Sequence, residues 1–193
     1  GLMMDYPLTL THFFERCRRL FARKTLATRI PGAPLFRYTY ADFCERTTRL
    51  AGALQALGLK KGDRVGTFAW NSHRHLEIYW AAPLLGVVLH TVNIRLSPQD
   101  LTYIINHAGD SVLLVDASLW PIVEPIRKDL KTVRHFVIMP DAPGPAPAGV
   151  LEYETLLREA RPVTTWPQLD EDDACGMCYT SGTTGHPKGV VYS

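Results

Sequence analysis

The sequence predicts an α/β fold built on a doubly wound, largely parallel β-sheet that is flanked by helices. Apolar, β-prone stretches alternate along the chain with helical segments of about a dozen residues, the order typical of parallel sheets. Glycine, proline and capping residues separate most of these segments. The 193 residues are 46% hydrophobic and 21% charged, so the composition is that of a globular chain with a substantial core.

The first third of the chain begins with a predicted helix over 12–24, whose apolar side chains recur at helical spacing along one face. A β-prone alternation over 36–40 predicts a strand, and the helical period returns over 41–57. Gly58 ends that helix, because glycine readily adopts the left-handed conformation found at helix ends. A glycine–aspartate turn then leads into a predicted strand over 64–69.

The middle of the chain continues the alternation. A helix over 72–85 begins at a polar cap, which is either Asn71 or Ser72. A short apolar strand follows over 87–91. A serine–proline pair opens the next helix, 98–108, because serine caps a helix well and proline suits its first position.

The last helical and strand segments are less regular. An apolar strand is predicted over 111–115, a helix over 119–130 and a second strand over 135–139. The proline- and glycine-rich stretch 140–149 is expected to be a stiff surface excursion. A short helix follows over 153–159, and the pattern closes with β-prone stretches at 175–179 and 190–192.

Three other features suggest metal or redox chemistry and are better explained structurally. Cys175 and Cys178 form a C-x-x-C motif, but on a strand these positions face opposite sides, and no second pair completes a zinc site. The acidic run 170–173 is typical of a solvated turn. His73 and His75 are two residues apart on a predicted helix, so they point apart and do not share a metal.

Charge and hydropathy exclude several classes of partner. The 21 basic and 19 acidic side chains nearly balance, which gives no electrostatic case for nucleic acid. The longest apolar run, 79–89, is broken by proline and glycine and is far shorter than the ~20 residues that span a membrane. With no signal peptide visible, a cytoplasmic protein is expected. Because the helix over 12–24 is basic, peripheral membrane association stays an alternative to a surface helix docked on the core.

The segment 179–189, Tyr-Thr-Ser-Gly-Thr-Thr-Gly-His-Pro-Lys-Gly, carries the clearest chemistry. Its glycines let backbone N–H groups approach a ligand, its hydroxyls donate to phosphate oxygens, and its lysine supplies positive charge. It is not the P-loop NTPase pattern, because Gly189 stands where that pattern needs serine or threonine. The residues predicted to bind phosphate are Thr180, Ser181, Gly182, Thr183, Thr184, Gly185, Lys188 and Gly189.

This segment resembles the phosphate-binding signature of the adenylate-forming superfamily, which includes acyl-CoA synthetases, luciferases and peptide-synthetase adenylation domains. Segments 39–43 and 85–93 and the junction 58–65 also resemble the family in order and spacing. Residues 90–98 and 189–193 resemble medium- and long-chain fatty acyl-CoA synthetases more than aryl or amino-acid activators.

The resemblance implies a ligase that uses ATP, Mg²⁺ and CoA to convert a fatty acid first to acyl-AMP and then to acyl-CoA. It assigns Lys188, as the catalytic residue, and the loop around it to the β- and γ-phosphates, and it assigns Thr180 to the magnesium ion. Tyr179 is expected to pack at the strand end, and His186 has no assigned role. Since related synthetases are often dimers, a homodimer is left open.

The family's later motifs, among them the C-terminal lysine needed for adenylation, do not occur in residues 1–193. We therefore expect an incomplete N-terminal domain that is inactive alone. It comprises leading helices and strand (1–58), a βαβ core (59–139), a proline-rich excursion (140–168) and the loop with its two strands (169–193). The alternatives are an acyl-AMP ligase or aryl-CoA ligase of the same superfamily, or a noncatalytic truncated nucleotide-binding module.

Overall fold

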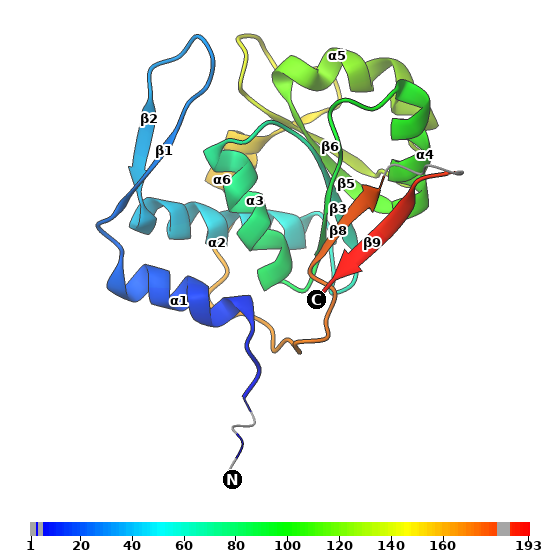
Figure 1. The fold of residues 1–193 in the computed structure, drawn as a ribbon. Coiled ribbons are helices and arrows are strands. Elements are labelled where there is room, and N and C mark those ends of the chain that lie inside the picture. Colours follow the sequence, from blue (N-terminus) through cyan, green and yellow to red (C-terminus); the bar gives the residue numbers. More distant parts are fainter. Residues whose placement is uncertain (1–2, 4–5, 181–185) are drawn as a thin grey trace.

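The structure is a computed structural model that describes Met3 and residues 6–180 and 186–193 (Figure 1). Within these residues, seven strands form one sheet in the order β7–β6–β5–β3–β4–β8–β9. Neighbours from β7 to β8 run parallel, and only β9 is antiparallel to its partner. The strands are β3 (Arg64–Phe68), β4 (Val88–Thr91), β5 (Asp110–Asp116), β6 (His135–Met139), β7 (Leu151–Glu152), β8 (Gly176–Thr180) and β9 (Lys188–Tyr192).

Helices cover both faces of this sheet, which confirms the predicted doubly wound α/β class. On one face lie α2 (Tyr40–Ala56), α3 (His73–Leu84) and α6 (Tyr153–Glu159), and on the other lie α4 (Pro98–Ala108) and α5 (Trp120–Val123) (Figure 1). Each strand serves both layers, because successive side chains point to opposite faces. In β5, Val112 and Leu114 pack into the first layer, whereas Leu113 and Val115 pack into the second.

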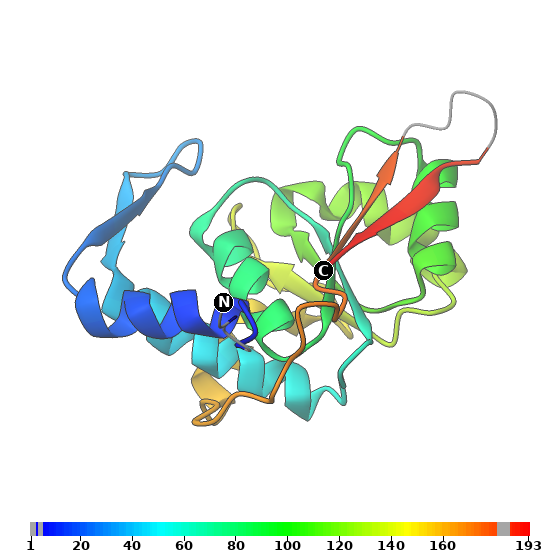
Figure 2. The same cartoon turned by 60° about the horizontal axis from the view of Figure 1, so that its bottom comes forward.

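A smaller unit flanks the first helical layer. It consists of α1 (Leu10–Leu20) and a two-stranded antiparallel hairpin, β1 (Thr25–Thr28) and β2 (Phe36–Thr39). Phe14 of α1 is buried in an aromatic cluster with Tyr38 and Phe43. Figure 2 shows this hairpin on the opposite side of the molecule from the β8–β9 hairpin, so the two do not share a site.

Local capping explains why several predicted helix starts agree with the structure. The Thr39 hydroxyl accepts from the Asp42 N–H while the Asp42 carboxylate accepts from the Thr39 N–H, which is a complete capping box at α2. Ser72, rather than Asn71, caps α3, because its hydroxyl accepts from the N–H three residues later. Gly109 ends α4 in the left-handed region at φ 71°.

The predicted helix over 119–130 is wrong as a single helix. The structure has a 3₁₀ turn at Ala117–Leu119, the one-turn α5, and a second 3₁₀ segment at Glu124–Asp129. Pro121 and Pro125 lack the N–H groups that a continuous α-helix would need, so the segment is broken into short pieces.

The structure differs from the prediction in three other places. Two strands, β1 and β7, were not predicted, and α1 ends at Leu20 instead of continuing to residue 24. Beyond Leu20 the chain turns at Phe21 and enters β1, whose pairing with β2 outweighs the helical pattern.

Among the residues described, no helix is long and apolar enough to cross a membrane.

Candidate phosphate-binding site

The predicted phosphate-binding segment connects β8 to β9 at the edge of the sheet where the parallel strands end (Figure 2). Thr180 is the last residue of β8 and Lys188 is the first of β9, and the two are paired across the hairpin. Both are exposed. The structure therefore brings a hydroxyl and an ammonium group to the mouth of one loop. The other predicted residues Ser181, Gly182, Thr183, Thr184 and Gly185 lie outside the described residues.

Gly189 has a specific steric reason to lack a side chain. It is paired with Tyr179, and a Cβ added at Gly189 would lie 3.2 Å from Cζ of that tyrosine. The Tyr179 ring thus covers the backbone of β9 directly behind Lys188. Tyr179 also packs at the edge of the second core layer, as predicted for a residue at the strand end.

A cleft of about 390 Å³ opens beside this hairpin. The lining residues after β4, which are apolar except for Asn93, form one wall, and the end of β8 forms another. Because carboxyl ends of parallel strands meet at one edge, ligands of doubly wound folds bind at this kind of position. The cleft is lined by Ala69, His75, Thr91, Val92, Asn93, Ile94, Leu96, Ile104, Cys178, Tyr179, Thr180 and Pro187.

A buried histidine–aspartate pair lies beneath the cleft and was not predicted. His90 Nδ1 is 2.7 Å from Asp110 Oδ2, and both side chains are fully buried. Gly66 leaves room for the carboxylate, because a Cβ there would lie 2.7 Å from Oδ2. Burial raises the pKa of Asp110, and the hydrogen bond to His90 opposes that rise. The centroid of the Tyr179 ring lies 5.1 Å from that of the His90 ring, so the histidine–aspartate pair contacts the end of β8 through Tyr179.

A second unpredicted group sits between the ends of β3 and β5. The Trp70 N–H donates to Asp116 Oδ2 at 2.7 Å, and the Trp70 indole N–H donates to the Ser118 hydroxyl at 3.2 Å. Burial raises the pKa of Asp116 to about 7, partly offset by the Trp70 N–H, and the charge of Asp141 raises it further. The connections from β3 and β5 leave in opposite directions along the sheet, so this is the topological switch point of the fold. The sequence signal that could have indicated this site is the polar residues that follow β3 and β5, namely Asn71, Ser72 and Ser118.

The cysteine and acidic motifs have the structural roles predicted for them. Cys175 and Cys178 are free thiols that line different hollows, and Cys178 Sγ is 3.0 Å from the Tyr192 hydroxyl. Asp173 pairs with Lys61 at 2.6 Å and accepts from the Asp170 N–H, as expected of a solvated turn. Within the described part of the chain, no three His, Cys, Asp or Glu residues could together hold a metal ion.

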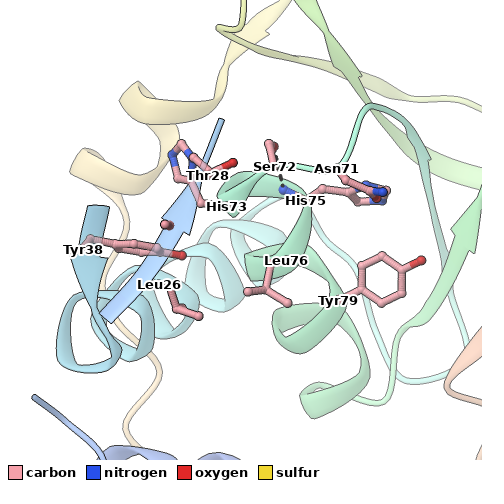
Figure 3. Close-up of a pocket in the computed structure, with 10 residues that line it drawn as sticks. Leu26, Thr28, Tyr38, Asn71, Ser72, His73, His75, Leu76 and Tyr79 are labelled. Carbon is pink, nitrogen blue, oxygen red and sulfur yellow. Dashed lines mark hydrogen bonds between the residues drawn. The ribbon is translucent and has the colours of Figure 1, made fainter. Parts of the chain in front are cut away.

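His73 and His75 make separate contacts, as predicted. The His73 ring packs against the Phe36 ring with centroids 4.4 Å apart, whereas His75 Nε2 is 3.0 Å from the Thr67 hydroxyl. Figure 3 shows both in a hollow of about 290 Å³ between the β1–β2 hairpin and the start of α3, with His73 beside Thr28. Of the predicted phosphate-binding residues that the structure describes, Thr180, Lys188 and Gly189, none lines this hollow.

The sequence matches a known protein family and is similar to two named ligases. A family model described as "AMP-binding enzyme" matches residues 15–193. The chain is 53% identical over 192 residues to a long-chain-fatty-acid–CoA ligase of Thermus thermophilus, covering 99% of this chain and 34% of that protein. It is 43% identical over 200 residues to a 3-methylmercaptopropionyl-CoA ligase of Ruegeria lacuscaerulensis, covering 100% of this chain and 36% of that protein.

A solved structure shares the fold closely. The anthranilate CoA ligase AuaEII, in complex with anthranoyl-AMP, superimposes with a TM-score of 0.86 at 26% identity, over 97% of this chain and 35% of that one. The chain thus spans about a third of the length of each protein compared here.

Proposed function

The chain belongs to the AMP-binding enzyme family, and on this premise we propose that it forms the first part of an ATP-dependent fatty acid–CoA ligase. In the proposed reaction, the fatty acid carboxylate attacks the α-phosphate of ATP, which gives acyl-AMP and releases pyrophosphate. The thiol of CoA then attacks the acyl carbon and releases AMP. The observation that carries the proposal is the pairing of Lys188 with Thr180 at the mouth of the 179–189 loop, beside an open cleft.

The proposed roles follow from the chemistry of the groups. The ammonium of Lys188 neutralises the β- and γ-phosphates, and the hydroxyls and amides of 181–185 donate hydrogen bonds to their oxygens. A charge-assisted hydrogen bond contributes about 1.5–3 kcal/mol, so a few of them hold a triphosphate. Their common effect is to fix ATP with its α-phosphate open to attack.

Magnesium fits this site as part of the bound nucleotide. When bound, Mg²⁺ neutralises phosphate charge. Thr180 would give it one hydroxyl oxygen, and the remaining ligands would be phosphate oxygens and water, an arrangement that magnesium favours.

A fatty acid is the proposed substrate because the chain is 53% identical to a long-chain-fatty-acid–CoA ligase. The anthranoyl-AMP complex of the AuaEII structure favours a second candidate, an aryl-CoA ligase. An acyl-AMP ligase is the third, and it differs in needing no CoA for its product.

The test is pyrophosphate release by the full-length enzyme with fatty acids of increasing chain length and with aryl acids, each with and without CoA. We expect fatty acids to be preferred and acyl-CoA to form only when CoA is present. A preference for aryl acids would contradict the fatty-acid proposal, and an end product of acyl-AMP would contradict the ligation step. The chain of residues 1–193 alone is expected to form no thioester, and ATP-dependent thioester formation by it would overturn that expectation.

We also propose that the enzyme is cytoplasmic and binds anionic membrane surfaces peripherally through α1. Phe13 and Leu20 of α1 are 59% and 62% exposed. Arg16 and Arg19 of α1 are also exposed, as is Arg23 in the turn that follows the helix. A helix that exposes both apolar and basic side chains suits the boundary of an anionic bilayer.

Vesicle co-sedimentation tests this surface. Replacing Arg16 and Arg19 with glutamate should lower partitioning onto phosphatidylglycerol vesicles by at least about 5-fold for each arginine, the contribution of one basic side chain. Lys128→Glu, an exposed change on another side of the molecule, should leave partitioning unchanged. Equal binding to neutral phosphatidylcholine vesicles would contradict the electrostatic part of the proposal. A homodimer that buries Phe13 and shows no vesicle binding would replace the membrane with a second copy as the partner.

A further inference from the structure

The outer half of the β8–β9 hairpin is not held by sheet pairing to β4. β8 pairs with β4 at only two positions, Leu89 with Gly176 and His90 with Met177. The pairing of β8 with β9 continues beyond them to Thr180 and Lys188. Figure 2 shows the hairpin extending from the other strands beside α4. Side-chain contacts must therefore fix the position of its outer end.

Four rings make those contacts, and they reach both ends of the segment 181–185. On the near side, the Tyr179 hydroxyl is 2.7 Å from His107 Nδ1 of α4. On the far side, the His186 ring stacks on Tyr103 of α4, with centroids 4.6 Å apart and planes 26° apart.

The two α4 residues also support each other. Tyr103 and His107 are one helical turn apart, and their rings stack at 5.2 Å with planes 23° apart. Tyr179 and Tyr103 are half-buried, whereas His107 and His186 are exposed. One face of α4 thus carries a short column of rings that contacts the chain before and after the loop.

We propose that Tyr103 and His107 are positioning residues that hold the two ends of the phosphate loop, with Tyr179 and His186 as their partners on the loop. This inference rests on the proposed function of that loop. Contacts that hold Tyr179 and His186 in place lower the conformational entropy that these two positions lose when a ligand binds. It also fixes Lys188, which follows His186 by two residues. His186, which had no predicted role, is the residue that connects the far end of the loop to α4.

The first test measures Michaelis constants of the full-length enzyme. His186→Leu and Tyr103→Leu should each raise KM for MgATP by about 3- to 10-fold, the range expected from losing one aromatic stack. KM for the fatty acid and for CoA should stay unchanged. His186→Phe and Tyr103→Phe keep the ring and should restore a KM for MgATP close to that of the wild type. Failure of the phenylalanine variants to restore it would overturn stacking as the cause.

A matched control and a double variant complete the design. The His12 ring of α1 contacts Tyr6 at the same 4.6 Å centroid distance, with planes 33° apart, so His12→Leu should leave all Michaelis constants unchanged. The double variant Tyr103→Leu/His186→Leu should be no worse than Tyr103→Leu alone, because Tyr103→Leu already removes the contact with His186. Fully additive effects, or equal changes in every Michaelis constant, would overturn the proposal. If Lys188→Ala impairs adenylation but these variants have no effect, the positioning role of α4 is wrong and the phosphate-binding role of the loop is supported. If none of the variants has an effect, both proposals are wrong.

Discussion

Replacing Lys188 with alanine in the full-length enzyme is expected to lower the rate of acyl-adenylate formation by about 100-fold, the usual cost of losing one group that stabilises developing charge. The effect should appear in pyrophosphate release with saturating fatty acid. The fold should tolerate the change. The Lys188 side chain is exposed, and no carboxylate of the described residues lies within ion-pair distance of it. An exposed substitution of this kind changes stability by about 0.5 kcal/mol or less.

Lys60→Ala is the matched control for this experiment. Lys60 is also exposed, but it lies in the turn before β3, at the opposite edge of the sheet from the loop. We expect it to leave both turnover and melting temperature unchanged. A Lys188→Ala enzyme that releases pyrophosphate at the normal rate would contradict the phosphate role. So would a variant that unfolds but whose remaining folded fraction turns over normally.

The parts of the fold that could be predicted depend on neighbouring residues in the sequence. Helix α4 was predicted with its observed bounds because a serine cap, an initial proline and Gly109 all act within one turn of its ends. Strand β6 and helix α6 were likewise predicted with their observed bounds. Strand β7 could not be, because Leu151–Glu152 is extended only through its pairing with β6, far away in the sequence. The break at Pro121 and Pro125 is a local effect of the two prolines, so it could have been predicted from the sequence.

The candidate site shows the same division. The loop 179–189 was found because its glycines, hydroxyls and lysine are consecutive. The contacts that place the loop were not found, because each joins residues distant in the sequence. His90 of β4 contacts Asp110 of β5 across the strand β3 that lies between them. Tyr103 and His186, which also contact each other, are 83 positions apart in the sequence. A histidine in the middle of a buried strand does signal that a polar partner is needed, but it does not name that partner.

Arg46→Met should cost about 3–5 kcal/mol of stability, the effect of leaving a buried carboxylate without its cation. Glu77 of α3 is fully buried, and Arg46 Nε donates to its Oε1 at 2.7 Å. The Tyr153 hydroxyl donates to Glu77 Oε2, also at 2.7 Å, and Glu154 accepts from both Arg46 and Arg74. These contacts join α2, α3 and α6 into one layer. Native-state hydrogen exchange should therefore show all three helices opening more readily in the variant.

Arg49→Met is the control, because Arg49 lies on the same helix but forms an exposed pair with Glu45, which is worth about 1 kcal/mol or less. Adding Glu77→Gln to Arg46→Met should recover part of the loss, since glutamine buries no charge. The pH dependence has a defined sign. Burial raises the pKa of Glu77, opposed by Arg46, so without Arg46 the deficit should shrink as pH falls toward the unfolded value of 4.5. Equal losses in the Arg46 and Arg49 variants, or a deficit that does not change with pH, would contradict a buried charge at the centre of this layer.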